Sequence, residues 1–298
     1  MLDITPARSD GRLVVAANGR LRLLRPGRAT TAPFAPAYST PLGPEAYIAR
    51  SPGQRVPGAG CRFGRDAVFA LEPTGRTGVI AIDRSGHARR FADVAGPGLL
   101  SGLAFDTTGR FGHRLLVTRS ESGGATVLAL DCRGRLRDVA RTTVPIEGGI
   151  AVAPAAFGRF GGQLVGADEN SGRIVAVGAD GRSRVIARSG LPVGGDIGVE
   201  SAGFAPPDFD AHWSAYVADR ATPGNPHPGS DALLALGGRS LTRAGVRAGD
   251  LLVVTEAGAQ TIAVRCRRRC TVHHIADGPP AAHVEGHVVF GRHARPER

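Results

Sequence analysis

Four glutamates stand at or near the start of short apolar segments that recur along this chain. Glu147 opens "EGGIAV", Glu200 lies in "VESAGF", Glu285 lies in "VEGHVVF" near the C-terminus, and Glu45 lies in the looser phrase "PEAYIAR". A carboxylate can bind a cation, exchange a proton or accept hydrogen bonds from backbone N–H groups. The recurrence of one residue type at the head of similar segments predicts that these carboxylates meet at one place in the fold.

Convergence of four carboxylates has an electrostatic consequence. Two like charges about 4 Å apart repel by ~1 kcal/mol in water and by ~4 kcal/mol at an effective dielectric of 20, so the set needs protonation, arginine partners or a cation. Carboxylate oxygens in a flexible ring favour calcium over softer metals. Two alternatives stay open. In the first, each glutamate accepts hydrogen bonds from backbone N–H groups of a neighbouring strand and no metal is bound. In the second, the phrase around Glu200 is shifted by one residue relative to the other phrases.

The segments that must position these residues follow a regular order. The phrases are roughly fifty residues apart, and the gap before Glu285 is about two such periods. After "EGGIAV" the sequence predicts strands at "QLVGAD", "RIVAVGA" and "RVIARS", and the segments 45–94 and 101–143 repeat this order. With 43 glycines, 21 prolines, 5% aromatic residues and no sustained helical pattern, the chain is predicted to be all-β.

Six units of four antiparallel strands predict a six-bladed β-propeller, formed by residues 1–298 as a single domain. The long gap predicts one unit with a degenerate opening phrase near "GGRSLTRAGVRAGD". The N-terminal segment "RLVVAANGRLRLLR", with an Asn18-Gly19 hairpin turn, supplies only the later strands of a unit. The C-terminal strand "EGHVVFG" is therefore expected to join the N-terminal blade and close the ring. A pair of β-sandwiches is the alternative, but it does not explain the period.

The chain resembles the six-bladed propellers grouped around senescence marker protein 30, the gluconolactonases, the strictosidine-synthase-like proteins and the NHL repeats. "SGLAFDTTGRFGHRLLVT" is similar to the phrase "NGLAFSPDGxxLYVA" of that group, and "VEGHVVF" is similar to its "EGPxW" phrase. In lactonases of this kind the glutamate and the asparagine of these phrases bind a divalent metal, usually calcium, in the central tunnel. The resemblance implies that Glu285 is a metal ligand and that Ser101 stands in the place of the asparagine.

Histidines flank the last glutamate. His287 lies two residues from Glu285, on the same face of a regular strand, where it is predicted to act as a general base on metal-bound water. A hydrogen-bonded structural histidine is the alternative, and His283 lies on the other side of Glu285. A second series of carboxylates follows later strands and is expected to be structural: Asp168, Asp219 and Glu256.

Two classes of function follow from these residues. The first is a metal-dependent hydrolase of the lactonase or esterase kind, with calcium as its metal, a small molecule as its substrate and His287 as its base. Its candidate metal ligands are Glu45, Glu147, Glu200, Glu285 and Ser101. The second is a non-catalytic binding propeller that presents loops such as 219–231 to a ligand or a protein partner.

Composition excludes several other classes. All 37 basic residues are arginine, so the chain has no lysine for a Schiff base or a phosphate-binding loop. The net charge of +11 is spread over hairpin tips without interleaved aromatic residues, which argues against nucleic acid as a partner. No apolar run is long enough to span a membrane. We expect a monomer.

The cysteines and the N-terminal residues bear on the compartment. Cys266 and Cys270 flank a predicted hairpin turn and are expected to form a disulfide under oxidising conditions, whereas Cys61 and Cys132 are isolated in the sequence. No signal peptide is visible. The chain is expected to be cytoplasmic, or exported and given without its leader.

Overall fold

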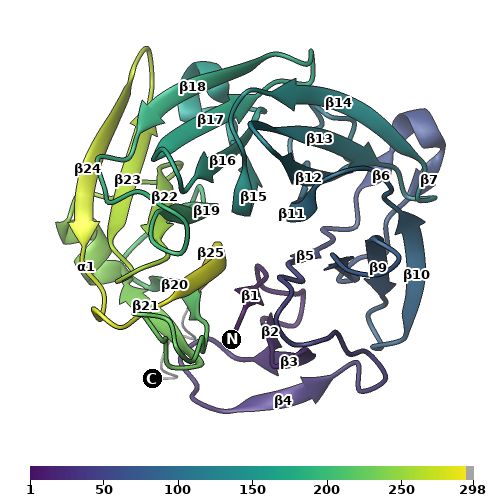
Figure 1. Ribbon diagram of the computed structural model, residues 1–298, viewed down its shortest axis with the longest axis horizontal. Coiled ribbons are helices and arrows are strands. Elements are labelled where there is room, and N and C mark those ends of the chain that lie inside the picture. Colours follow the sequence, from purple (N-terminus) through teal and green to yellow (C-terminus); the bar gives the residue numbers. More distant parts are fainter. Residues whose placement is uncertain (293–298) are drawn as a thin grey trace.

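The computed structural model describes residues 1–292, which form six β-sheet blades arranged as a ring around a central axis (Figure 1). Blades 1 to 4 follow one another along the chain, and each contains four antiparallel strands. From the axis outward the strands are β1 (Asp3–Ile4), β2 (Leu13–Ala17), β3 (Arg20–Leu24) and β4 (Thr31–Phe34) in blade 1; β5 (Ile48–Arg50), β8 (Val68–Glu72), β9 (Gly78–Ile82) and β10 (Ala88–Asp93) in blade 2; β11 (Leu99–Phe105), β12 (Leu115–Glu121), β13 (Gly124–Leu130) and β14 (Leu136–Thr142) in blade 3; and β15 (Glu147–Val152), β16 (Leu164–Asp168), β17 (Arg173–Val177) and β18 (Ser183–Arg188) in blade 4. The predicted six-bladed, all-β fold is confirmed.

Blades 5 and 6 are interleaved along the chain. Blade 5 begins with β19 (Val199–Phe204), but the chain then leaves it to form β20 (Trp213–Asp219) and β21 (Ala232–Gly237) of blade 6. After helix α1 (Gly238–Arg243) it returns to complete blade 5 with β22 (Leu251–Thr255), β23 (Thr261–Cys266) and β24 (Cys270–Ala276). Finally β25 (Val284–Arg292) becomes the inner strand of blade 6 and pairs antiparallel with β20, so blade 6 has three strands where four were predicted. A single parallel pair, Ala202 opposite His287, also connects β25 to β19 of blade 5.

This topology corrects two predictions about the ring. The C-terminal strand does not join the N-terminal blade, because β1 is the inner strand of blade 1 and pairs with β2, with Asp3 opposite Ala16. The segment expected to hold a degenerate opening phrase forms α1 and the turn after it. The opening phrase of the interleaved blade is the one around Glu285. A paired segment of only two residues, Asp3–Ile4, gives no alternating pattern that would mark it as a strand.

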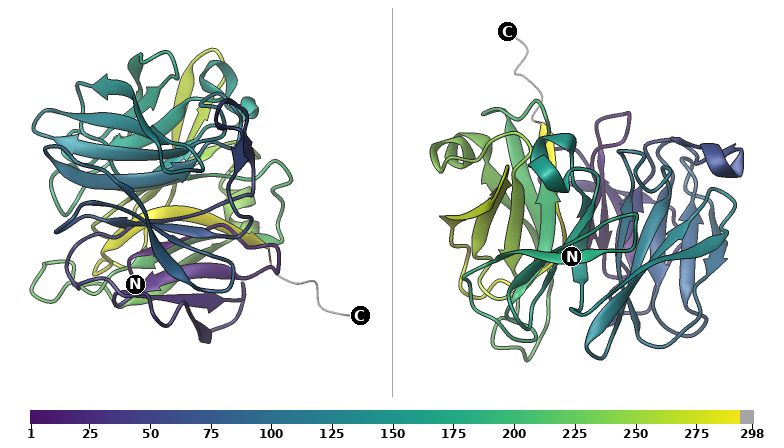
Figure 2. Two further views of the ribbon diagram at one scale, coloured as in Figure 1. Left: turned by 90° about the vertical axis from the view of Figure 1, so that its right-hand side faces the viewer. Right: turned by 90° about the horizontal axis from the view of Figure 1, so that it is seen from above.

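The ring closes between blades 6 and 1 by side-chain packing. Ile4 and Val15 of blade 1 lie in one apolar cluster with Tyr216 and Val289 of blade 6. Seen from the side, blade 6, with the yellow strand β25, lies next to the purple strands of blade 1 (Figure 2). No β-ladder within residues 1–292 joins the two blades.

A buried carboxylate also connects the strands at this seam. Asp3 is 0% exposed and accepts hydrogen bonds from the backbone N–H groups of Ile48, at 2.7 Å, and of His287, at 2.8 Å. Its Oδ1 also lies 2.9 Å from Nδ1 of the His287 ring. One carboxylate therefore links the inner strands of blades 1, 2 and 6.

Four short elements lie outside the blades in addition to α1: β6 (Arg55–Val56) and β7 (Cys61–Arg62), which pair around the 3₁₀ turn η1 (Pro57–Ala59), and the 3₁₀ segment η2 (Ala155–Phe160). At the tip of the β2–β3 hairpin, Asn18 and Gly19 have φ of 49° and 68°, as the predicted two-residue turn requires. In the part of the chain that the structure describes, no helix combines the length and apolar character that crossing a membrane requires.

All four cysteines form disulfides. The predicted bond between Cys266 and Cys270 joins β23 to β24. The second bond, between Cys61 and Cys132, connects a loop of blade 2 to the turn after β13 in blade 3 and was not predicted, because its partners are 71 residues apart. This bond fixes two neighbouring blades covalently.

Candidate acidic site at one end of the axis

The two ends of the central axis differ in chemistry. A single pocket is lined by the C-terminal parts of five inner strands, β5, β11, β15, β19 and β25. These strands therefore run in the same direction along the axis. Their N-terminal parts lie at the opposite end, where Glu147, Glu200 and Glu285 are the first or second residues of β15, β19 and β25, and Glu45 precedes β5. One end of the axis is therefore acidic, and the other is mainly apolar.

Irregular backbone follows two of these glutamates. The strand register shifts after Glu147 in β15, and it shifts again where β25 passes Gly286. Gly148 and Gly286 have φ of 67° and 70°, and a Cβ on Gly148 would lie 2.3 Å from Cγ of Glu200. Glycine after the glutamate is therefore required both by the backbone conformation and by the close approach of neighbouring strands.

Glu45, Glu200 and Glu285 meet around the hydroxyl group of Tyr47, and these four residues are called the acidic cluster below. The hydroxyl oxygen lies 3.0 Å from Glu45 Oε2, 2.5 Å from Glu200 Oε1 and 2.9 Å from Glu285 Oε2. One oxygen of each glutamate lies within 4.8 Å of the others. A phenol carries one proton, so Tyr47 donates to one carboxylate at a time. The other two need further compensation.

Two basic side chains supply part of that compensation. Arg220 Nη1 lies 3.0 Å from Glu45 Oε1 and 2.9 Å from Glu285 Oε1, and Arg220 also donates to the carbonyl of Gly43. His283 Nε2 lies 2.8 Å from Glu256 and 3.5 Å from Glu285. Glu200 has no basic partner among the described residues.

Further carboxylates extend the acidic cluster. Glu256, His283 and Glu285 form a second group whose potential ligand atoms lie within 4.8 Å of one another, and Glu169, Glu200 and Glu256 form a third. The region thus gathers five glutamates around Arg220 and His283. Even with both basic groups charged, full ionisation leaves a surplus of negative charge.

Burial and mutual repulsion shift the titration of these groups. Burial, followed by the repulsion of neighbouring carboxylates, raises the pKa of Glu200 well above its usual range and raises the pKa of Glu45 to about 7 and that of Glu169 to about 8. Burial alone would lower the pKa of His283, but Glu256 and Glu285 outweigh it and raise the pKa to about 10. Burial opposes ionisation of Glu285, yet its bonds to His283 and Arg220 lower its pKa.

We expect the stability of the cation-free protein to fall as pH rises from about 5 to about 9. Glu45, Glu169 and His283 all bind a proton more tightly in the folded protein than in the unfolded chain, so folding is favoured at low pH. The stabilising contribution of Glu45 is lost between pH 4.5 and about 7, that of Glu169 between 4.5 and about 8, and that of His283 between 6.5 and about 10. Thermal unfolding in metal-free buffers across this range measures it.

Glu169→Gln is the informative variant for this pH dependence. The substitution removes the pH-dependent contribution of Glu169 to stability. The melting temperature of the variant should therefore decline less steeply than that of the wild type up to about pH 8. A melting temperature that rises with pH in the wild type would contradict the assigned protonation.

The structure brings together three of the five predicted metal ligands, Glu45, Glu200 and Glu285. Glu147 lies beside them but does not belong to any of the three groups. Burial raises the pKa of Glu147, and a hydrogen bond from Ser120 opposes this shift. Ser101 Oγ lies 2.8 Å from the carbonyl of Ile146 and 2.9 Å from Ser120 Oγ. Ser101 therefore bonds within blade 3 and to the start of blade 4, and it does not contact the acidic cluster.

Several residues of this region had no assigned role in the sequence analysis. Tyr47, two residues after Glu45, was part of a recognised phrase, and Glu169 and Arg220 directly follow the carboxylates Asp168 and Asp219. Glu256 was expected to be structural, yet it belongs to two of the three carboxylate groups. For Glu169 and Arg220, the position directly after a recurring carboxylate was the available signal.

His287 lies apart from the acidic cluster. Its Nδ1 contacts Asp3 at 2.9 Å, and its Nε2 contacts the carbonyl of Leu103 at 3.0 Å. Burial opposes its charge, but Asp3 and the carbonyl groups raise its pKa, since both ring nitrogens face acceptor oxygens. The bulge at Gly286 breaks the alternation that would place His287 on the face of Glu285. This geometry favours the structural alternative, and the catalytic role of His287 stays a prediction from the sequence.

No protein-family model matches the sequence, and no curated protein matches it at a significant level. Solved structures do match its fold. A putative TolB from Agrobacterium tumefaciens has 11% identity and a TM-score of 0.50, and the match covers 99% of this chain and 90% of that one. A protein of unknown function from Bacteroides thetaiotaomicron has 9% identity and a TM-score of 0.55, with 98% and 65% covered.

A gluconolactonase from Xanthomonas campestris has 13% identity and a TM-score of 0.45, and the match covers 78% of this chain and 70% of that one. Matches at such identities carry no activity from one protein to the other. The chain is a six-bladed β-propeller, as the order of its strands shows, and it shares this fold with the two structures of TM-score 0.50 and 0.55.

Proposed function

We propose that this protein is a hydrolase of the lactonase or esterase kind that depends on a divalent cation, with calcium as the preferred ion, bound at the acidic cluster. One observation carries the proposal. Glu45, Glu200 and Glu285 reach one point from three different blades and leave a surplus of negative charge there. Stability alone gives no reason to gather more carboxylates than basic partners, because each buried charge without a partner destabilises the fold.

The donor atoms fit a hard cation. Glu45, Glu200 and Glu285 offer oxygen atoms, the ligands that calcium prefers. Each carboxylate has about four acceptor positions, so the bonds from Tyr47 and Arg220 leave capacity on all three. When bound, such a cation polarises a carbonyl group and lowers the pKa of a coordinated water molecule.

Residues around the acidic cluster have suitable chemistry for ester hydrolysis. Glu169, whose pKa is raised to about 8, is the group we assign to remove a proton from the attacking water. Arg220 lines a neighbouring cavity of about 370 Å³, where its guanidinium can donate to the oxyanion of the tetrahedral intermediate. His283, charged below about pH 10, holds Glu256 and Glu285 in place.

Turnover measurements on a panel of lactones and carboxylic esters test this proposal. We expect hydrolysis by the calcium-loaded wild type and its loss after chelation. Glu169→Gln should lower kcat by about 10²- to 10⁴-fold while calcium binding persists, because the variant removes the base and spares the proposed ligands. Glu72→Gln is the matched control, since Glu72 is a glutamate of blade 2 that pairs with Arg90.

The second function, a non-catalytic binding propeller, is favoured by a different observation. Arg220 and Tyr47 already bond the carboxylates of Glu45 and Glu285, an arrangement that also suits a purely structural role. Calcium binding without turnover of any compound in the panel would support this second function over the hydrolase.

A further inference from the structure

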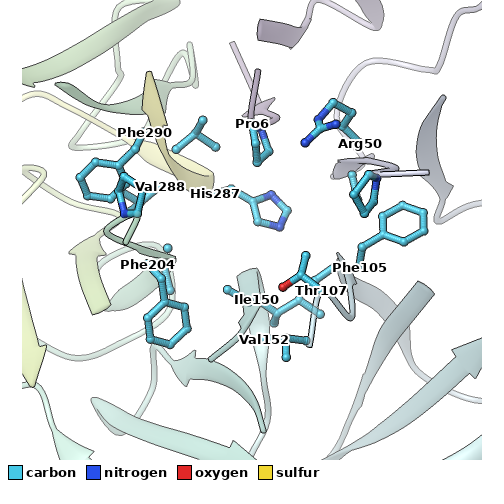
Figure 3. Close-up of a pocket in the computed structure, with 18 of the residues that line it drawn as sticks. Pro6, Arg50, Phe105, Thr107, Ile150, Val152, Phe204, His287, Val288 and Phe290 are labelled. Atoms are coloured by element: carbon cyan, nitrogen blue, oxygen red, sulfur yellow. The ribbon is translucent and has the colours of Figure 1, made fainter. Parts of the chain in front are cut away.

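At the other end of the axis, a pocket of about 410 Å³ lies between the C-terminal ends of the inner strands (Figure 3). Its walls are mainly apolar and include Phe105, Val152, Phe204 and Phe290, which come from four different blades. This volume is in the range of small-molecule sites. The hydrolase chemistry proposed above uses none of these residues.

The ionisable side chains that line this pocket are basic. Among the described residues that line it, there is no aspartate or glutamate, whereas Arg50 and His287 are both present. The charge of His287 is compensated by Asp3, which lies below the pocket surface. Arg50 is therefore the group that sets the electrostatic preference of the pocket.

Arg50 is incompletely bonded. Only its Nη1 makes hydrogen bonds among the described residues, to the Ser51 carbonyl at 3.3 Å and to Asp66 Oδ1 at 3.4 Å. Its Nε is buried without a partner. The side chain is 18% exposed, and Figure 3 shows its guanidinium group at the edge of the pocket beside Pro6. Its Nη2 makes no hydrogen bond among the described residues and is not fully buried, so an oxygen-bearing ligand in the pocket can accept a hydrogen bond from it.

The anionic partner of Arg50 is shared. Asp66 also accepts hydrogen bonds from the backbone and the hydroxyl of Ser9. Arg8, which is 6% exposed and has Nε and Nη1 buried without hydrogen-bond partners, acts electrostatically on both Arg50 and Asp66. Arg8 Nε also lies 3.7 Å from Asp10, a carboxylate that pairs with Arg12 at 2.7 Å. Three guanidinium groups thus share the two carboxylates of Asp66 and Asp10, and positive charge is left over beside an apolar cavity.

We propose that this pocket binds a small amphipathic monocarboxylate, with its apolar body against Phe105, Phe204 and Phe290 and its carboxylate on Arg50. A planar carboxylate matches the fork of a guanidinium group and can bond two of its N–H donors. The apolar body removes the aromatic side chains of the walls from water. This site is separate from the acidic cluster and goes beyond the proposed hydrolase function.

The chain contains a built-in reporter for this site. Trp213 is the single tryptophan of the sequence, and it lines the pocket. Titration with octanoate, followed by tryptophan fluorescence, should give a saturable change in the wild type. 1-Octanol and octylamine, which carry the same chain with a neutral or a cationic head, should bind at least about tenfold more weakly, since they lack the charge-assisted bonds.

Two variants separate this site from nonspecific binding. Arg50→Gln should weaken octanoate about ten- to hundredfold and leave 1-octanol unchanged. Ala151→Leu, which adds bulk to the pocket wall and keeps every charge, should weaken both compounds. Arg182→Gln, at a side chain that is 91% exposed, is the matched control and should bind octanoate like the wild type.

The proposal is wrong if octanoate and 1-octanol bind alike, if Arg50→Gln binds octanoate normally, or if no saturable change occurs. Octanoate binding should also be unaffected by calcium and by Glu200→Gln. If the hydrolase proposal fails, the expected octanoate binding is unaffected. If octanoate does not bind, the proposal for the acidic cluster is unaffected.

Discussion

Removal of residues 284–298 is expected to prevent folding of the whole chain rather than to fray its end. The deletion removes β25, the inner strand of blade 6, and with it the buried side chains of Val284, Val288, Val289 and Phe290. Burial of such a side chain contributes about 1.5–3 kcal/mol, so the sum approaches the total stability of an ordinary domain. Circular dichroism and thermal unfolding of the truncated chain measure the effect.

Supplying residues 284–298 as a separate peptide is the control for this deletion, because it restores the strand without restoring the chain connection. We expect the peptide to recover the native spectrum in a concentration-dependent manner. A truncated chain that melts within about two degrees of the full-length protein would show that blade 6 does not need its inner strand.

Asp3→Ala is expected to destabilise the protein by about 3–5 kcal/mol, the range for removing one partner of a buried ion pair. Without the carboxylate, the N–H groups of Ile48 and His287 lose their acceptor, and the His287 ring stays buried without its counter-charge. Chemical denaturation of the variant and the wild type gives this difference directly.

Two comparisons make the Asp3 result specific. Asp3→Asn keeps the shape and one acceptor oxygen, so its loss should be intermediate. Asp180→Ala, at a side chain that is 62% exposed and faces Arg182, should change stability by less than about 1 kcal/mol. Equal losses in Asp3→Ala and Asp180→Ala would refute the role of Asp3 in closing the ring.

Periodicity was sufficient to predict blades 2 to 4, because each of them repeats the same order of strands and turns along the chain. It also located Glu45, Glu200 and Glu285 at one end of the axis, since equivalent positions of a ring face one another. The interleaving of blades 5 and 6 was not predictable, because β20 and β22 have the same strand-forming composition and either suits β19 as a partner. The choice is made by tertiary packing.

The position of the side chains within the site depended on details that a strand pattern does not contain. His287 was placed on the face of Glu285 by the regular alternation of a strand, and the bulge at Gly286 removes that regularity. Arg220 reaches Glu45 across 175 positions of sequence, because the end of β20 in blade 6 and the start of β5 in blade 2 lie at the same end of the axis. Tertiary contacts of this length leave no periodic signal.

Calcium titration of the purified, metal-free protein at pH 7 tests the central claim most directly. Calorimetry in two buffers of different ionisation enthalpy reports both binding and the protons released. We expect saturable binding with proton release, because the pKa of Glu45 is raised to about 7, so part of its population holds a proton in the cation-free protein. A hundredfold excess of calcium over Kd should stabilise the fold by about 2.7 kcal/mol. The double variant Glu45→Gln, Glu200→Gln should lose both signals, and Glu72→Gln should keep them. A wild type that shows neither heat of binding nor any change in melting with millimolar calcium would contradict a cation site at the acidic cluster.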